Sequence, residues 1–500
     1  MSTFHGLEMA KQALSTQRSA LYTTGHNISN VNTEGYSRQR VHFETARPYP
    51  SASRNRPQIA GQMGNGVEAG SIERIRNQFL DYQYRTENSK AGYWVEMSDA
   101  ISRMERLMHE QSKNGLGSTM NQFRDSLQEL SAHPTNSGAR SVVVQRGLAV
   151  AETFNYLSES LNANRSDLQN KIGITVKGAN SLLGQVNEIN EQIKHLESSG
   201  YLANDLYDHR DRLLDGLSEI VNIKVTYHKS SENALDVADG VATIELVDAK
   251  GQPFTPPATL IDGQTGEVQT LSVYYSPDNQ AVTSLQTGEK TIPIKQTTGS
   301  LAGIIESYGY MHKDKLEGIY PDMLANLDKL AATFATAFNG VHQEGYDLNE
   351  NKGKALFEFK KGYGAAGSIT VSREILDEPD LIAASIDENS GNGDNAASLA
   401  NIFDEKLTSL GSNTTLNSFY ESLIGDLGVR GQEAHRMAKN TEILRSQVDN
   451  QRLSVSSVSL DEEITNMVKY QHAYNAAARS MTTLDEMLDR IINNMGLVGR

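Results

Sequence analysis

Apolar residues recur at helical spacing at both ends of the chain. In the N-terminal segment the intervals are three, four or seven residues, through Phe4, Leu7, Ala10, Leu14, Leu21 and Ile28. A denser series occupies the C-terminal segment: Ile464, Met467, Tyr474, Ala478, Met481, Leu484, Leu488, Ile491 and Met495. These narrow stripes predict two amphipathic helices that each need a partner to bury their apolar face. The three-residue intervals between Ala478 and Leu484 indicate a perturbed supercoil.

Further helices are predicted between the two ends. One runs through residues 75–108, after a segment at 51–76 that we expect to be irregular or β. A second follows a break at His133-Pro134 and carries apolar residues from Phe154 to Leu196, a length of roughly 65 Å at about 1.5 Å per residue. Helical spacing returns at 323–338 and from 416 to the C-terminal end, on either side of a mixed region at 341–400. Such rods are typical of bundles and filament subunits.

The helical pattern gives way to alternation between residues 221 and 300. Apolar residues occupy every second position of VNIKVTY, and LSVYY and TIPI follow between turns that carry Gly, Asp and Asn. The predicted fold is therefore mainly α with an inserted β domain, in which the terminal helices pair as a coiled coil. A long helical rod forms the middle, and the small β domain lies at the outer tip. The predicted domains are a terminal coiled-coil assembly domain (1–50 plus 456–500), a helical rod domain with short strands (51–220 plus 301–455) and the outer β domain (221–300).

The composition argues against several classes of function. A net charge of −16 disfavours general binding to nucleic acid or to anionic membranes. The absence of cysteine excludes disulfides, thiolate catalysis and Cys-ligated metals. The N-terminal residues lack the basic and apolar regions of a secretory signal, and no apolar run approaches the roughly 18 residues of a membrane span. We expect any export to proceed without a cleaved signal peptide.

No group of residues has the spacing of a catalytic or cofactor site. The glycines of GQMGNGVEAG lack the strand–turn–helix setting of a dinucleotide fingerprint, and Walker A and G-x-S-x-G motifs are absent. Asp208 and Asp211 lie one helical turn apart, but Arg210 and Arg212 alternate with them. We interpret this segment as a salt-bridged structural helix rather than a metal site. The prediction is a protein without enzyme activity, cofactor or metal.

Two local features allow more than one interpretation. Residues 38–76 contain seven arginines against three acids, which indicates a solvated surface or, alternatively, contact with an acidic neighbouring subunit. The C-terminal stripe is rich in methionine (Met467, Met481, Met487 and Met495). Methionine is usual in a core, and it also suits an interface that adapts to more than one partner.

Both ends of the chain carry family motifs. NISNVNTEGYSRQRV resembles the N-terminal signature of the bacterial flagellar axial proteins, the family of rod, hook and hook-associated subunits; the matching positions are Asn27, Ile28, Asn30, Asn32, Thr33, Gly35, Tyr36, Ser37 and Arg38. SVSLDEEITNMVKYQHAYNAAARSMTTLDEML resembles the C-terminal motif of that family through Val458, Leu460, Glu462, Glu463, Tyr470, Gln471, Tyr474, Ala476, Ala477 and Thr483. NDLYDHRDRLLDGLSEIV, TTGSLAGIIES and NGVHQEGYDLN resemble the hook-associated subunits in particular. The likeness omits only the β insertion.

The resemblance implies a structural subunit of the bacterial flagellum, at the junction between hook and filament. It implies secretion through the flagellar type III export apparatus with the help of an export chaperone. The implied partners are copies of the chain in a ring or helical homo-oligomer, the hook protein on one side and a second hook-associated junction protein on the other. Nucleic acid and membrane are not expected as partners. Alternatives are a hook or distal rod subunit, a non-flagellar helical scaffold, and an enzyme hidden in the β insertion.

The terminal segments supply the candidate assembly residues. The resemblance implies that the terminal helices line a narrow channel as an inner coiled coil and become ordered on subunit docking. Asn and Gly tolerate unusual backbone angles, so we predict an assembly hinge at residues 27–38, with contacts to neighbouring subunits from Tyr36 and Arg38. The full predicted set is Leu7, Leu14, Leu21, Asn27, Ile28, Asn30, Asn32, Gly35, Tyr36, Arg38, Ile464, Met467, Tyr470, Tyr474, Met481, Leu484, Leu488 and Ile491.

Overall fold

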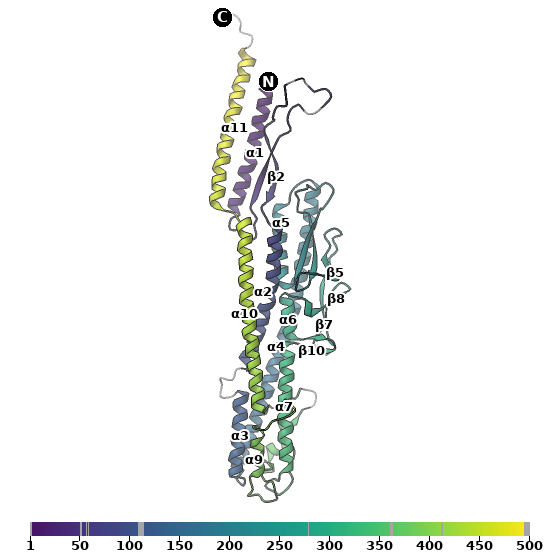
Figure 1. The fold of residues 1–500 in the computed structure, drawn as a ribbon, viewed down its shortest axis with the longest axis vertical. Helices are drawn as coiled ribbons and strands as arrows, with labels where there is room; N and C mark the ends of the chain where they lie inside the picture. Colours follow the sequence, from purple (N-terminus) through teal and green to yellow (C-terminus); the bar gives the residue numbers. More distant parts are fainter. Residues whose placement is uncertain are drawn as a thin grey trace.

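The chain forms a long rod with both termini at one end (Figure 1). The computed structural model describes residues 3–50, 53–56, 58, 60–108, 115–278, 280–360, 364–411 and 414–494. Met495 of the predicted C-terminal stripe lies outside these residues. Helices account for 59% of the structure and the remainder includes small β-sheets, which confirms the mainly α fold class.

The terminal unit consists of two helices and a β-ribbon. Helices α1 (Thr3–Ser29) and α11 (Leu460–Asn494) run side by side (Figure 1). Their pairing as a coiled coil stays a prediction. Strands β1 (Gln39–Thr45) and β2 (Val67–Arg74) pair in antiparallel fashion and pack on α1. The sequence did not predict β1. The predicted boundary at residue 50 falls between the two strands, and the domain boundaries stay predictions.

Burial on α11 recurs every three or four residues. The positions between Glu463 and Leu488 that are not exposed include Met467, Tyr470, Ala473, Ala477, Met481 and Leu484. The intervals from Ala473 to Ala477 and from Ala477 to Met481 are both four residues, so the alternation of three and four is interrupted there. The perturbed supercoil between Ala478 and Leu484 stays a prediction.

The rod is a bundle of helices that run nearly parallel to its axis (Figure 1). Its helices are α2 (Gln78–Met108), α3 (Leu116–Ala132), α4 (Ser137–Ser198), α5 (Asn204–Ile220), α6 (Ser300–Tyr308), α7 (Ile319–Glu344), α8 (Arg373–Asp377), α9 (Asp394–Asn401) and α10 (Leu416–Ser456). Helix α4 has 62 residues and is about 93 Å long at about 1.5 Å per residue. The Asn136 side chain begins α4 by accepting hydrogen bonds from the Gly138 and Ala139 amides. The predicted break at His133-Pro134 is confirmed.

Aromatic rings fill the part of the rod farthest from the termini. Strands β11 (Phe357–Phe359) and β12 (Ile369–Val371) form a small ribbon against α4 and α7. Phe334 and Phe338 on α7 have ring centroids 4.6 Å apart, and both lie within 6.1 Å of the Phe357 ring. These side chains are completely buried, so each contributes roughly 1.5–3 kcal/mol through apolar burial. The cluster ties the return segment of the chain to the outgoing helices.

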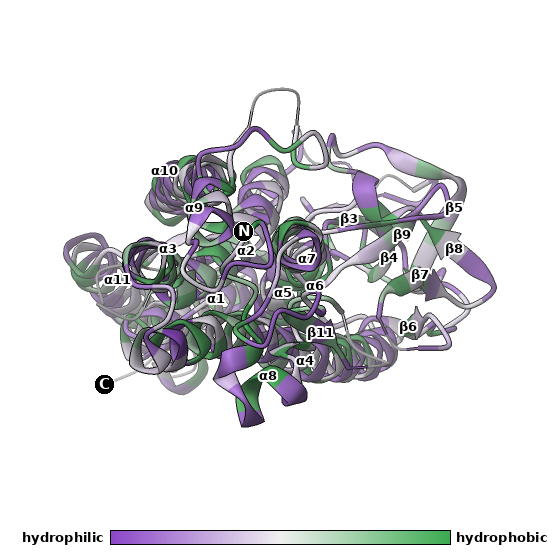
Figure 2. Cartoon of the chain, turned by 90° about the horizontal axis from the view of Figure 1, so that it is seen from below, coloured by the Kyte–Doolittle hydropathy of each residue, from purple (hydrophilic) through white to green (hydrophobic). Residues whose placement is uncertain are grey.

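The β structure lies beside the middle of the rod. One sheet contains β3 (Ile223–His228), β4 (Val241–Val247) and β5 (Pro253–Ile261). The other contains β6 (Leu271–Tyr275), β7 (Val282–Thr287), β8 (Lys290–Ile292), β9 (Tyr310–His312) and β10 (Lys315–Glu317). Along the rod axis, the sheets project to one side of the helices (Figure 2). The β domain was predicted to lie at the outer tip. It does not lie at either end of the long axis, because α3, α4, α7 and α9 form the end farthest from the termini (Figure 1).

A buried histidine makes the rod sensitive to acid. The Nδ1 atom of His342 contacts the Lys354 carbonyl at 2.5 Å, and Nε2 accepts a hydrogen bond from the Ala383 amide at 2.9 Å. Burial, reinforced by the charge of Arg140, lowers the pKa of His342 from 6.5 to about 4, so the ring stays neutral in the fold. Because the unfolded chain binds a proton first, this stabilising contribution is present above pH 6.5 and disappears as the pH falls toward 4.

We expect acidification from pH 7 to pH 4.5 to remove about 2–3 kcal/mol of rod stability through His342. Urea denaturation at both pH values, compared with His342→Gln, measures this difference directly. The variant keeps a polar side chain that does not titrate, so it is expected to lose less stability on acidification. Equal losses of stability in the two proteins would show that His342 is not the source of the acid sensitivity.

Candidate hinge and assembly surface

Asn27 joins three elements where the terminal unit meets the rod. Its side-chain amide donates to the Gln39 carbonyl at 2.8 Å and to Glu463 Oε2 at 3.1 Å. Its Oδ1 accepts from the Tyr36 hydroxyl at 2.8 Å and from the Gln39 amide at 3.0 Å. The residue is 1% exposed, so these bonds replace contact with water. Asn27 therefore links the last turn of α1 to β1 and to the first turn of α11.

Arg38 fixes the passage from α10 to α11. Its Nε bonds Glu463 Oε1 at 2.8 Å, and its Nη1 bonds Glu462 Oε2 at 2.6 Å. Its backbone amide donates to the carbonyl of Ser456, the last residue of α10, at 2.8 Å. The acids also lie in the first turn of α11, where the helix dipole favours negative charge.

The turn between α1 and β1 requires glycine at position 35. Gly35 has φ +77°, and a Cβ atom there would lie 2.4 Å from side-chain carbons of Arg212 on α5. The Asn30 side chain caps the end of α1 by donating to the His26 carbonyl at 3.0 Å. Asn32 is exposed. The predicted segment 27–38 is thus a compact turn held by internal bonds, and the contacts of Tyr36 and Arg38 with a neighbouring subunit stay a prediction.

A buried arginine–aspartate cluster lies beneath this turn. It joins β2, α2, α5, α10 and the loop before β4 through the following residues: Arg74, Arg76, Asp81, Arg85, Asp208, Asp211, Asp215, Asp239 and Arg452. Asp211 is at the centre, with carboxylate oxygens 3.0 Å from Arg74, 3.4 Å from Arg76 and 3.0 Å from Arg85. The backbone amide of Ser37 donates to Asp208 Oδ2 at 2.9 Å. The cluster therefore connects the hinge directly to the rod.

The charges of the cluster balance the cost of burying it. Burial alone would raise the pKa of Asp211, but the charges of Arg76, Arg74 and Arg85 hold it well below its usual value. The sequence identified α5 as salt-bridged but expected its arginine partners on the same helix. They come instead from β2, from the segment between β2 and α2, from α2 and from α10. The interpretation of residues 38–76 as a solvated surface is accordingly wrong for Arg38, Arg74 and Arg76, which pair inside the chain.

The predicted stripe residues of the terminal helices fall on two faces. Leu7, Leu14, Leu21 and Ile28 on α1 are partly buried, as are the α11 residues Met467, Tyr470, Met481, Leu484 and Leu488. Other predicted residues of α11 remain open: Ile464 is 53% exposed, Tyr474 37% and Ile491 42%. Leu460 and Val468 continue the open face of Ile464 at four-residue spacing. This exposed strip is the apolar surface that a neighbouring subunit can cover.

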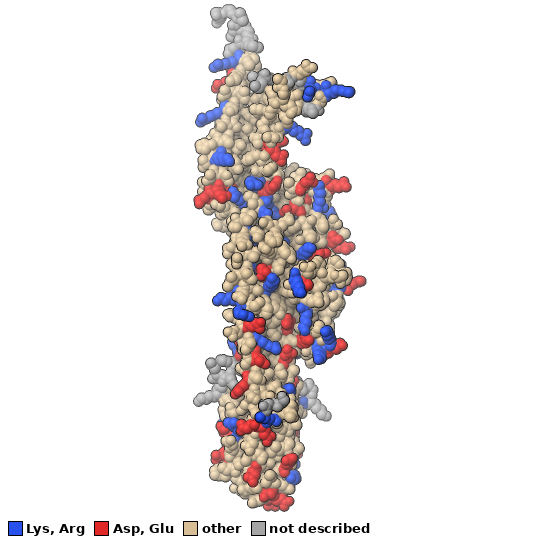
Figure 3. Space-filling view, viewed as in Figure 1, with Lys and Arg blue, Asp and Glu red and all other residues tan. Residues whose placement is uncertain are grey.

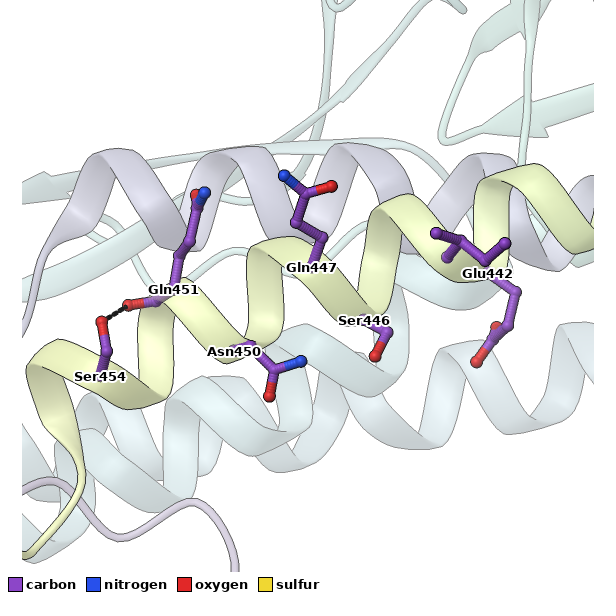
Figure 4. A pocket seen from close by; sticks show the side chains of 7 residues that line it. Glu442, Ser446, Gln447, Asn450, Gln451 and Ser454 are labelled. Atoms are coloured by element: carbon purple, nitrogen blue, oxygen red, sulfur yellow. Dashed lines mark hydrogen bonds between the residues drawn. The ribbon is translucent and has the colours of Figure 1, made fainter.

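The groove in Figure 4 lies on a single helix. It is lined by Ile443 and by polar side chains of α10 that include Gln447, Asn450 and Gln451, so no second element closes it. Among the described residues, no group of three or more His, Asp or Glu side chains is arranged to hold a metal ion. No described helix is long and apolar enough to cross a membrane.

Replacing Asn27 with alanine is expected to loosen the hinge. The change leaves the Gln39 amide and one Glu463 oxygen without a partner, at a cost of about 1–3 kcal/mol. Hydrogen exchange at the Gln39 amide measures this as faster local opening. Asn32→Ala is the matched control, because Asn32 is exposed. Equal exchange in the two variants would show that Asn27 does not hold the hinge.

Comparisons with known proteins match the whole length of the chain. Residues 101–357 match the model of the flagellar hook-associated protein FlgK helical domain. Residues 7–36 match a flagella basal body rod protein model, and residues 449–495 match the C-terminal model of flagellar basal body rod FlgEFG proteins. The two terminal matches cover most of α1, the hinge as far as Tyr36, and α11. They define the chain as an axial protein of the bacterial flagellum.

Full-length relatives identify the family within this class. Flagellar hook-associated protein 1 of Bacillus subtilis (strain 168) is 46% identical over 508 residues, with 100% of both chains covered. The Salmonella typhimurium protein of that name is 22% identical, over 97% of this chain and 98% of its own. The FlgK hook junction protein structure from Burkholderia pseudomallei shares the fold, with a TM-score of 0.58, 14% identity and coverage of 76% of this chain and 100% of its own. The chain belongs to the flagellar hook-associated protein 1 family.

Proposed function

We propose that this chain is a structural subunit of the junction between hook and filament and assembles through α1 and α11 after type III export. Members of its family are structural proteins of that junction. The observation that carries the proposal is 46% identity to a family member over the entire length, including both terminal segments. The partners would be further copies of the chain, the hook protein and a second junction protein.

The geometry supports this role in three steps. The open strip of Leu460, Ile464 and Val468 gives α11 an apolar face for neighbouring subunits beside the face that α1 covers. Asn27 and Arg38 set the direction in which the terminal pair leaves the rod. The arginine–aspartate cluster then connects that hinge to α2, α5 and α10. Such a subunit can contact both the hook and the filament without a change in the angle between its terminal helices and its rod.

Removal of the gene tests the proposal. We expect cells with hooks but without filaments, and filament protein released into the medium, because the filament would have no base on which to assemble. Electron microscopy of the cells and protein gels of the medium provide the measurement. Restoration by the intact gene is the control, and normal filaments in the deletion strain would rule the function out.

A further inference from the structure

Helix α10 has one long face that the rest of the described chain leaves open. The helix packs on α2 and α7, and on its other side Val429 is 66% exposed and Ile443 54%. Exposed residues recur on this side at alternating intervals of four and three, and we call them the α10 face: Val429, Glu433, Arg436, Asn440, Ile443, Gln447, Asn450 and Ser454. The groove in Figure 4 lies on the same face. This spacing is that of a helix that packs beside a second, nearly parallel helix.

Helix α4 has a second open face with the same spacing. Tyr156 is 62% exposed and Ile174 70%, although both lie well inside a 62-residue helix. The exposed residues around them recur every three or four positions, and we call them the α4 face: Glu152, Tyr156, Glu159, Ala163, Asp167, Asn170, Ile174 and Lys177. At about 100° per residue they spread over only about 80° of the helix circumference, so they form one continuous face.

The two faces lie on opposite sides of the rod. Helix α4 packs on α5, α6 and α7, whereas α10 packs on α2 and α7. In the view along the axis, the bundle separates α10 from α4, and the β-sheets project from a third side (Figure 2). Both helices run toward the termini (Figure 1). Parallel copies related by rotation can therefore bring the α10 face of one copy against the α4 face of the next, as in a heterologous contact.

Contacts with α2 give the relative heights of the two faces. Lys171 of α4 pairs with Glu96 of α2, and Arg445 of α10 bonds Asn88, which lies eight residues earlier on α2. Helix α2 runs in the direction opposite to α4 and α10 (Figure 1). Arg445 therefore lies at the height of the α4 residue about eight positions beyond Lys171.

This height brings two pairs of residues to matching positions on neighbouring copies. Ile443 and Ile174 differ in height by about three residues, or about 5 Å at about 1.5 Å per residue, and so do Arg436 and Asp167. On each helix the two members are seven residues apart, so both pairs can form together. Arg436 and Asp167 are exposed, and neither forms an ion pair with the part of the chain that the structure describes.

The charges around these pairs are opposite on the two faces. The exposed charged residues of α4 between 152 and 170 are all acidic: Glu152, Glu159 and Asp167. Between 430 and 440, α10 exposes three bases, Arg430, Arg436 and Lys439, against the single acid Glu433. Lys and Arg atoms lie along the middle of the rod on its α10 side, which Figure 3 shows. Such complementarity favours contact between the two faces and fixes their register.

Glycines accompany both faces without a packing role inside the chain. Outside the surrounding turns of their own helix, no described atom lies within 4 Å of a Cβ placed at Gly173, Gly178, Gly425 or Gly428. Glycine inside a helix is destabilising relative to alanine, and it allows another backbone to approach closely. The glycines lie near Ile174 and Val429, where a neighbouring helix would approach.

We propose that the α10 face of one copy packs along the α4 face of the next copy. The inference rests on the proposed function, because it requires assembled subunits, and it adds a contact between rods to the contact between terminal helices. Ile443 covers Ile174, and Arg436 pairs with Asp167. A second copy is the partner that fits, because both faces belong to this chain, run in the same direction at similar heights and carry opposite charges.

The absence of native cysteine allows the contact to be tested by cross-linking. A chain with both Asn440→Cys and Asn170→Cys replaces one exposed amide on each face and keeps the proposed pairs intact. Hook ends isolated from a strain with this chain are oxidised. We expect disulfide-linked species of three or more copies, because each copy carries one cysteine on each face. Asn440→Cys with Gln264→Cys is the matched control, because Gln264 is an exposed amide in the turn after β5.

Charge substitutions in the double-cysteine chain test the polar pair. Arg436→Glu is expected to lower cross-linking per incorporated copy about tenfold, and addition of Asp167→Arg to the same chain is expected to restore it. Lys250→Glu is the control, because Lys250 is exposed in the turn between β4 and β5. Immunoblots of the hook ends measure incorporation. If Arg436→Glu is not incorporated, recovery of incorporation by Asp167→Arg is the readout in place of cross-linking.

The outcomes separate the two proposals. Absence of the unsubstituted chain from isolated hook ends would reject the proposed function itself. Its presence there, with no linkage of the double-cysteine chain or with equal linkage of the Gln264 control, would overturn the rod contact alone. Dimers from Asn440→Cys by itself would overturn it as well, because they would place two α10 faces together. So would cross-linking that Arg436→Glu leaves unchanged.

Discussion

Replacing Asp211 with asparagine is expected to lower the free energy of unfolding of the rod by about 3–5 kcal/mol. The carboxylate has almost no solvent contact and lies within 3.4 Å of three arginines from β2, α2 and the segment between them. Asparagine has nearly the same shape but no charge, so Arg74, Arg76 and Arg85 would remain buried with too few anions. Breaking a buried network in this way costs far more than losing a surface ion pair.

Urea denaturation monitored by circular dichroism measures this loss. Asp404→Asn is the matched control: Asp404 lies 3.9 Å from Arg124, but its side chain is 74% exposed. We expect the free energy of unfolding of this variant to change by less than about 0.5 kcal/mol. Similar small effects at both positions would mean that the cluster does not hold the hinge to the rod.

Truncation after Leu460 is expected to abolish incorporation into flagella and to leave the rod folded. The deletion removes nearly all of α11, which packs on α1 and whose Glu462 and Glu463 pair with Arg38 of the hinge. The Phe334 cluster and the helices around it are unaffected. Immunoblots of isolated hook ends measure incorporation, and the thermal transition of the purified protein measures folding of the rod.

Point variants on α11 separate assembly from folding. Ile464→Asp adds a charge to the open strip, where the side chain is 53% exposed and contributes little to the monomer. Thr465→Asp adds the same charge one position along, on a polar exposed site. We expect loss of incorporation only for the first variant. Full incorporation of the truncated chain or of Ile464→Asp would defeat the assignment of α11 as the assembly surface.

Periodicity predicted the helices well, because long amphipathic segments have only one way to bury a stripe. The tract from Phe154 to Leu196 lies inside α4, and the alternation after Val221 marks β3 correctly. Strand β1 was missed because QRVHFET carries charge on its open side and begins within a family motif that suggested only a turn. The tip position of the β structure was an inference from topology, and periodicity contains no information on where an inserted sheet packs.

The hinge illustrates what a sequence pattern leaves open. Asn27 and Arg38 were identified through their place in a motif, but their partner Glu463 lies more than 400 positions away and was not among the predicted site residues. The sequence contains the acidic pair Asp208 and Asp211 and an arginine-rich segment at 38–76. Their opposite charges were the available signal for the cluster. Local spacing cannot pair such segments. Only the fold brings them together.

Hydrogen exchange across α1 and α11 tests the central claim most directly, namely that the terminal pair is completed only by neighbouring subunits. In the isolated protein we expect amides of Ile464 to Leu488 to exchange rapidly while those of α4 stay protected. In isolated hook ends the same α11 amides are expected to become as protected as the rod. Slow exchange throughout α1 and α11 in the free monomer, unchanged on assembly, would contradict the account.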